Sequence, residues 1–111
     1  MMARKEGLEK IGPILEGFKQ ELKRIYGPRF KRLIVYGSYA RGEAEEGSDL
    51  DLLVVLDQVD DLLAERERLS DVILELSLRY DIVLSVLVVS EAHLEHHKPL
   101  FLNVKREGVA V

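Results

Sequence analysis

The segment between residues 33 and 56 limits what this chain can fold into more than any other part of the sequence. An apolar run, Leu33–Tyr36, ends abruptly in Gly37 and Ser38, and after ten intervening residues a second apolar run opens with Asp49 and Asp51. Side chains alternate between the two faces of a strand, so residues two apart point the same way. The sequence therefore predicts two strands, with both carboxylates on one face beside a glycine-serine bend.

Two neighbouring carboxylates repel each other, and each raises the pKa of the other. A bound cation relieves this conflict, and Mg²⁺ is the natural candidate because it takes oxygen ligands and keeps room for water and phosphate oxygens. Asp49 and Asp51 are therefore the candidate metal ligands and catalytic residues. Gly37 permits close backbone approach, Ser38 adds a hydroxyl group at a helix start, and Arg41 adds a planar cation, so these three are the candidates for binding phosphate.

The spacing of these residues resembles the signature of a known family. Gly37-Ser38, ten intervening residues and Asp49-Leu50-Asp51 are similar to the G-S-x10-D-x-D pattern of the DNA polymerase β-like nucleotidyltransferase superfamily. Residues 37–42 with 48–52, together with the tail at 99–108, resemble its smallest members, the minimal nucleotidyltransferases of bacteria and archaea. The resemblance implies the nucleotidyltransferase fold, an α/β (α+β) domain in which helices pack on a small mixed β-sheet in the order α-β-α-β-α-β-α.

Length and composition limit the class of protein. A chain of 111 residues fits one domain, here residues 1–111. The absence of cysteine excludes disulfides and thiolate metal sites, and the sequence shows neither a membrane-spanning apolar stretch nor a signal-peptide pattern, so we expect a cytoplasmic protein without membrane contacts. The formal net charge of -4 argues against nonspecific nucleic-acid binding, so DNA synthesis is not the expected function.

Hydrophobic periodicity predicts the order of the elements. A stripe from Leu8 to Ile25 has helical spacing, and Gly12-Pro13 marks either a kink or the true helix start. The long helix expected before the third strand makes the second and third strands parallel, with their N-terminal ends at one edge of the sheet. The third strand is apolar on both faces, so we expect it to be central or covered on both sides. The further predicted elements are strands at 30–36, 50–56 and 82–89, a helical turn at 38–42 and a long helix at 60–80.

The third strand also holds a departure from the family pattern. The resemblance implies a third carboxylate on that strand, which serves as a metal ligand or as the base that activates the attacking hydroxyl. Two residues are candidates for the position: Asp81, which opens the strand, and Ser85, in its middle. They have the same parity, so side-chain alternation does not separate them. If Ser85 holds the position, the site has only two anionic ligands, and metal binding and base catalysis both weaken.

The segment after the third strand predicts a helix N-cap at Ser90 followed by Glu91 in the first turn. His93, His96 and His97 follow. His93 and His97 have an i, i+4 spacing that can bind zinc, but no third ligand is evident, so a surface helix with ordinary histidines is favoured.

The last part of the chain predicts one more helix. Pro99 restarts a helix through Arg106, with Gly108 as its C-cap. Residues 109–111 are expected either to add an edge strand or to pack against a partner. The helix side chains expected to be partly buried are Leu100, Phe101, Leu102 and Val104.

The resemblance also implies a function. It implies a magnesium-dependent nucleotidyltransferase that moves a nucleoside monophosphate, AMP from ATP, onto an acceptor hydroxyl and releases pyrophosphate. Asp49 and Asp51 would hold the metal, Gly37 and Ser38 the triphosphate, and Arg41 would neutralise the departing pyrophosphate. The implied acceptor is a tyrosine of a toxin of the HEPN class (higher eukaryote and prokaryote nucleotide-binding), with this chain as the antitoxin. The alternative is a catalytically weak or inactive domain that neutralises the same partner by binding alone, and homo-oligomerisation is open.

Overall fold

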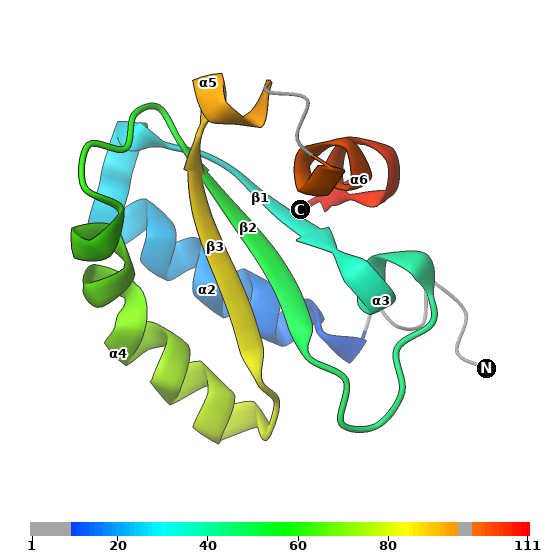
Figure 1. Cartoon of the computed structure of the whole chain (residues 1–111). Coiled ribbons are helices and arrows are strands. Elements are labelled where there is room, and N and C mark those ends of the chain that lie inside the picture. Colours follow the sequence, from blue (N-terminus) through cyan, green and yellow to red (C-terminus); the bar gives the residue numbers. More distant parts are fainter. Residues whose placement is uncertain (1–9, 96–98) are drawn as a thin grey trace.

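The computed structural model describes residues 10–95 and 99–111, and within them it confirms the predicted mixed α/β fold and the predicted order of elements. Figure 1 shows these elements along the chain. No helix in the described part of the chain is long and apolar enough to cross a membrane. The elements are α2 (Gly12–Tyr26), the 3-10 turn η1 (Gly27–Arg29), β1 (Phe30–Tyr36), α3 (Gly37–Arg41), β2 (Leu50–Leu56), α4 (Leu62–Tyr80), β3 (Leu84–Ser90), α5 (Glu91–Leu94), α6 (Pro99–Glu107) and β4 (Val109–Ala110).

Helix α2 starts at Gly12, with Pro13 in its first turn. Proline is tolerated there because the missing N–H would have no partner within the helix. The glycine-proline pair therefore lies at the start of α2, after a helical Lys10 and a turn at Ile11. Leu8, the first residue of the predicted stripe, lies outside the described residues. The helix ends at Gly27, whose φ of 55° is in the left-handed region that favours glycine.

The four strands form one mixed sheet in the order β3-β2-β1-β4 (Figure 1). Strands β2 and β3 are parallel, as the long intervening helix predicts, whereas β1 runs antiparallel to both β2 and β4. Strand β4 pairs Val109 with Val35 and Ala110 with Ile34, which confirms the edge-strand alternative for the end of the chain.

The third strand differs from the prediction in its bounds, and of the two predicted alternatives, a central strand or a strand covered on both sides, the second is confirmed. It runs from Leu84 to Ser90 instead of residues 82–89, and it lies at an edge of the sheet. The internal strands are β1 and β2, and residues 52–56 of β2 are all buried. The two apolar faces of β3 are covered by α4 on one side and by Leu94 of α5 on the other, and no described strand pairs with its outer edge.

Alternation along the strands separates two apolar cores. Leu33, Val35 and the even-numbered residues of β2 pack against α2 and α4. Ile34 and the odd-numbered residues 53 and 55 pack on the other face, against α5 and α6. Figure 1 shows α6 on the opposite side of the sheet from α2 and α4. The side chains that seal this second core are Leu94, Phe101 and Val104, whereas Leu102 is 45% exposed, so its predicted burial is wrong.

A buried carboxylate joins α4 to the end of α2. Glu65 is 5% exposed, and its two oxygens accept hydrogen bonds from the Tyr26 hydroxyl at 3.4 Å and from Arg29 Nη2 at 2.9 Å. Arg68 Nη1 lies 3.3 Å from the same carboxylate. Burial, together with the negative charge of Glu65, raises the pKa of Tyr26 to about 12. A buried charge is stable only when it is paired in this way.

We expect Glu65→Ala to lower the free energy of unfolding by about 2 to 4 kcal/mol, because the substitution leaves Tyr26 and Arg29 without their buried acceptor. Urea denaturation followed by circular dichroism measures the change. Glu67→Ala, an exposed position on the same helix, is the matched control, with an expected effect within about 0.5 kcal/mol. Equal stability of the two variants would contradict a structural role for the Glu65 cluster.

Candidate active site

The bend between β1 and α3 requires a glycine. Tyr36 is still extended, whereas Gly37, the first residue of α3, has a φ of 72°. Only glycine adopts this left-handed region without steric strain. The chain therefore turns out of the sheet in a single residue, and Ser38 follows in the first turn of α3.

The register of the sheet brings Asp51 to this bend. Strand β2 runs antiparallel to β1 and pairs Asp51 with Tyr36. The carboxylate of Asp51 then lies over Gly37, because a Cβ atom on Gly37 would be 2.2 Å from Asp51 Oδ2 and 3.0 Å from its Cγ. The glycine-serine bend and the second carboxylate thus converge, as the sequence predicts.

The electrostatics of Asp51 are unfavourable in the isolated chain. Asp51 is half-buried, whereas Asp49 is exposed in the loop before β2. Burial raises the pKa of the Asp51 carboxyl, the negative charge of Asp49 raises it further, and the Arg41 guanidinium lowers it in part. No side-chain hydrogen bond within the described residues compensates this carboxylate. A cation bound between the two aspartates would do so.

Arg41 lies close enough to act on Asp51, but it is held by two other carboxylates. Its Nε donates to Glu43 at 3.1 Å, and its Nη1 donates to Glu107, the last residue of α6, at 3.3 Å. Neither hydrogen bond uses Nη2. The pairing with Glu107 joins residues 66 positions apart, so no local pattern in the sequence could have revealed it.

The structure separates the two candidates for the third acidic position. Ser85 pairs directly with Asp51 across the parallel β2–β3 ladder, so Ser85 occupies the strand position beside the site. Asp81 lies before the strand, as the C-cap of α4, with a φ of 51°, and its backbone N–H donates to Ser77. Asp81 is not in the strand at all, so side-chain alternation does not apply to it. Within residues 10–95 and 99–111 no group of three histidine, aspartate or glutamate side chains could hold a metal ion.

The tyrosines beside the site differ in burial. Tyr36 lies on the same sheet face as Asp51, packs against the second core, and has a pKa raised by burial and by the charge of Asp51. Tyr39 is 8% exposed and belongs to the first core. Packing is thus the main role of both tyrosine rings.

The residues present fit Mg²⁺ as a two-carboxylate site. Mg²⁺ prefers hard oxygen ligands and usually completes its octahedral shell with waters and substrate phosphates. Asp49 and Asp51 supply such oxygens beside the bend, where Gly37 has no Cβ atom to meet the Asp51 carboxylate. Burial and, after it, the negative charge of Asp49 raise the pKa of Asp51, and a cation bound beside both carboxylates would offset this unfavourable charge.

The predicted N-cap at Ser90 is confirmed, because its Oγ accepts from the backbone N–H of His93 at 3.2 Å. His93 Nδ1 lies 3.1 Å from the same Oγ. His96 and His97 lie outside the described residues, so the i, i+4 zinc spacing stays a prediction.

Comparison with known proteins gives three findings. A family model described as a nucleotidyltransferase domain matches residues 15–106. The protein adenylyltransferase MntA of Thermococcus cleftensis is 42% identical over 77 residues, which cover 69% of this chain and 76% of that protein. A solved complex of the tri-AMPylated HEPN toxin of Shewanella oneidensis with its MNT antitoxin shares the fold, with a TM-score of 0.54 and 17% identity over 88% of this chain and 69% of that one.

We expect Gly37→Ala to disrupt the bend, because the added Cβ meets the Asp51 carboxylate and the alanine must adopt a positive φ. The left-handed conformation alone costs about 1 to 2 kcal/mol, and the clash adds to it. Gly12→Ala is the matched control, since a Cβ atom added at Gly12 would have no other atom within 4 Å and no strain arises there. Thermal unfolding measures both variants, and a Gly37→Ala protein as stable as the control would contradict the close approach.

We also expect Asp51→Asn to stabilise the metal-free protein at pH 7. The pKa of Asp51 is raised in the folded state, so folding favours the protonated carboxyl group. The protonated carboxyl is present in full below the pKa of an aspartate in the unfolded chain, about 3.9. Its contribution to the free energy of unfolding is lost as the pH rises through the pKa of Asp51 in the folded state. Melting temperatures of the variant and the parent should therefore differ at pH 7 and converge below about pH 4. A variant that is less stable than the parent at pH 7 would contradict an uncompensated Asp51.

Proposed function

Because this chain belongs to the nucleotidyltransferase family, whose model it matches over residues 15–106, we propose that it transfers AMP from ATP to a hydroxyl group of another protein. The observation that carries the proposal is the approach of the Asp51 carboxylate to Gly37, with Asp49 beside it and Ser38 next in the chain. This arrangement puts an anionic metal site against a bend suited to phosphate. The chain acts as one domain in the cytoplasm, without membrane or nucleic-acid contacts.

In this proposal the acidic pair and the bend hold the two ends of the nucleotide. Asp49 and Asp51 hold Mg²⁺, which when bound neutralises phosphate charge and polarises the reacting phosphorus. Gly37 lets the Asp51 carboxylate approach the bend, so that Gly37 and Ser38 would hold the triphosphate beside the metal ligands, with the Ser38 hydroxyl group and backbone amide directed at a phosphate. Arg41 neutralises the charge on the departing pyrophosphate, and its Nη2 is the group left over from the pairs with Glu43 and Glu107.

The acceptor supplies the hydroxyl oxygen. That oxygen bonds to the α-phosphorus, the bond from the α-phosphorus to pyrophosphate breaks, and the hydroxyl proton passes to water. A serine stands at the position beside Asp51 where the family pattern has a carboxylate, so this chain supplies no base at that position. Positioning and charge neutralisation carry most of a phosphoryl or nucleotidyl transfer, so we expect the reaction to be slow but measurable.

The acceptor class follows from the relatives. The relative from Thermococcus cleftensis is named a protein adenylyltransferase, and the Shewanella oneidensis complex holds an AMPylated HEPN toxin with its antitoxin. We therefore propose that the acceptor is a tyrosine of a HEPN-type toxin encoded beside this chain, and that this chain is the antitoxin.

A second candidate function is neutralisation of the same toxin by binding alone. Ser85 favours it, because it leaves the site with two carboxylates in the described part of the chain. In that case the nucleotide site would have no part in inhibition of the toxin.

Incubation with ATP labelled at the α-phosphate, Mg²⁺ and the HEPN-type partner separates these functions. We expect label on a partner tyrosine, identified by mass spectrometry, and a loss of more than about 100-fold in the variant carrying both Asp49→Asn and Asp51→Asn. Asp81→Asn is the control that should keep the label, since asparagine tolerates the left-handed helix cap at that position.

Label that persists in the double variant would contradict catalysis at Asp49 and Asp51. A double variant that adds no label yet still prevents growth arrest by the toxin would support inhibition by binding alone.

A further inference from the structure

The C-terminal part of the chain folds back to the bend at which the candidate site lies. Strand β4 pairs Val109 with Val35 of β1, two residues before Gly37. Gly108, between α6 and β4, lies directly against β1, because a Cβ atom added to it would be only 2.7 Å from Ile34 Cγ2. A side chain at this position would push the end of α6 away from the sheet. The end of α6 is therefore fixed against β1, close to the bend.

Glu107 is the residue that this contact brings to the site. It is the last residue of α6 and immediately precedes Gly108. Helices α3 and α6 contact each other, and Figure 1 shows them near the end of β1 that leads into the bend. Arg41 Nη1 donates to Glu107 at 3.3 Å, and Arg41 Nε donates to Glu43 at 3.1 Å. The guanidinium group is planar, so bonds from two of its nitrogens fix its plane and the direction of the third nitrogen, Nη2.

The stability of the fold does not explain the pair between Arg41 and Glu107. Their side chains are 39% and 33% exposed, and an ion pair with this exposure contributes little to stability. A carboxylate at the C-terminal end of a helix also opposes the helix dipole, which favours cations there, such as Lys105 and Arg106 in the same turn. Glu107 is thus unfavourable for its own helix, and its contact with Arg41 points to the site.

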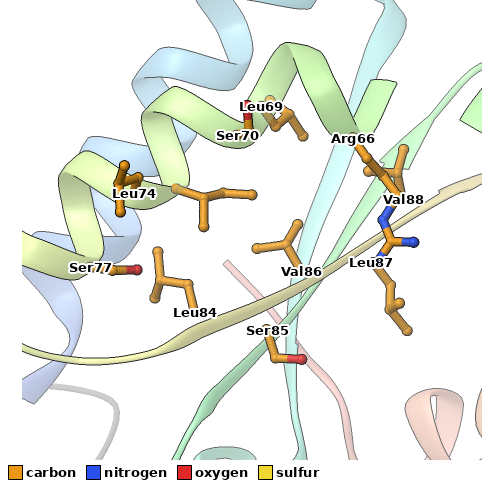
Figure 2. Close-up of a pocket in the computed structure, with 11 residues that line it drawn as sticks. Arg66, Leu69, Ser70, Leu74, Ser77, Leu84, Ser85, Val86, Leu87 and Val88 are labelled. Carbon is orange, nitrogen blue, oxygen red and sulfur yellow. The ribbon is translucent and has the colours of Figure 1, made fainter. Parts of the chain in front are cut away.

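Arg41 lies beside the acidic pair. Burial and the negative charge of Asp49 raise the pKa of Asp51, and the positive charge of Arg41 lowers it. Strand β3 adds no charge to this face of the sheet. In the close-up of the groove between α4 and β3, Figure 2 shows Ser85 pointing away from α4 and Val86 pointing toward it. Arg41 therefore lies where its charge can act both on Asp51 and on a phosphate group bound next to it.

We propose that Glu107 is a positioning residue for the transfer of AMP, and that it holds the Arg41 guanidinium with Nη2 directed at the pyrophosphate end of the nucleotide. This inference rests on the proposed function, which gives Arg41 a departing pyrophosphate to neutralise. A free arginine side chain has many rotamers and must be ordered at each turnover, whereas a held one is already in place. A cation placed in advance stabilises charge that develops in the transition state, so Glu107 should act on kcat more than on KM.

Two substitutions separate the positioning of Arg41 from the charge of Glu107. Glu107→Ala and Glu107→Gln both remove the negative charge, but only glutamine keeps an acceptor oxygen at the same reach from Arg41 Nη1. Transfer is measured with ATP labelled at the α-phosphate, Mg²⁺ and the HEPN-type partner. We expect kcat of Glu107→Ala to be at least about fivefold below that of Glu107→Gln, with KM values for ATP within about twofold of each other.

Glu95→Ala is the matched control. It removes another exposed ion pair of α6, in which Lys105 Nζ lies 3.2 Å from Glu95, without touching Arg41. Its kcat should stay within about twofold of the parent value. Circular dichroism checks that each variant is folded. Glu107→Asp decides the question if Glu107→Ala is not, because it keeps the charge but shortens the side chain, so its kcat should also fall below that of Glu107→Gln.

Nitrogen-15 NMR of the arginine side chains tests the same contact without ATP or an acceptor. Rotation of the Arg41 guanidinium should be slow in the parent and in Glu107→Gln and fast in Glu107→Ala, with Arg41→Lys assigning the signal. Inorganic pyrophosphate added with Mg²⁺ should shift the Arg41 signals of the parent. The dissociation constant of pyrophosphate should be at least about threefold higher in Glu107→Ala than in Glu107→Gln.

Three results would overturn the proposal. They are equal kcat values of Glu107→Ala and Glu107→Gln, a faster reaction in Glu107→Ala, which would mean that Glu107 withholds Arg41 from the nucleotide, and Arg41 signals that pyrophosphate leaves unchanged. An equal loss of kcat in Glu95→Ala would also contradict it, because the effect would then come from loosening of α6. If the parent adds no label to the partner, the proposed function is wrong, and the pyrophosphate titration alone decides whether Glu107 positions Arg41.

Discussion

The approach of the Asp51 carboxylate to the backbone of Gly37 is the constraint on which the rest of the structure depends. It exists only in one register of β1 against β2, the one that pairs Tyr36 with Asp51. A slip by one residue would turn Asp51 toward the core formed with α2 and α4, where an unpaired charge is costly. The two apolar cores on either side of β2 therefore protect the register, and the register places the carboxylate at the bend.

A second partly or fully buried acid, Glu65, differs from Asp51 in that its charge is paired. Glu65 is buried, yet it has three partners, and these tie α4 to the end of α2. Asp51 is half-buried, has no hydrogen-bonding partner in the described part of the chain, and lies beside another carboxylate. The contacts of Glu65 stabilise the folded protein, whereas the uncompensated charge of Asp51 destabilises it. An uncompensated acid in an otherwise well-packed sheet makes Asp51 a candidate for ligand binding.

The sequence predicted the local features well because each depends on neighbouring residues. Strands β1 and β2, the start of α2 at Gly12 or Pro13, the cap at Ser90 and the parallel pairing of β2 with β3 all follow from periodicity, capping chemistry or connection length. The convergence of Gly37 and Asp51 was predicted in the same way, because their positions at the ends of two paired strands put them at one edge of the sheet.

The features that the sequence did not predict are those that depend on contacts between distant parts of the chain. A run that is apolar on both faces predicts a covered strand, but it does not tell a central strand from an edge strand covered by helices, and β3 is the latter. Asp81 looked like a strand residue because nothing local showed that α4 ends there in a left-handed cap. The ion pair between Arg41 and Glu107 forms because α6 packs beside α3, and the periodicity of the sequence does not predict this contact. The place of β3 at the edge also bears on the chemistry of the site, because β2 is the only described strand that pairs with the strand holding Ser85, so no further described strand brings a third carboxylate beside Asp51.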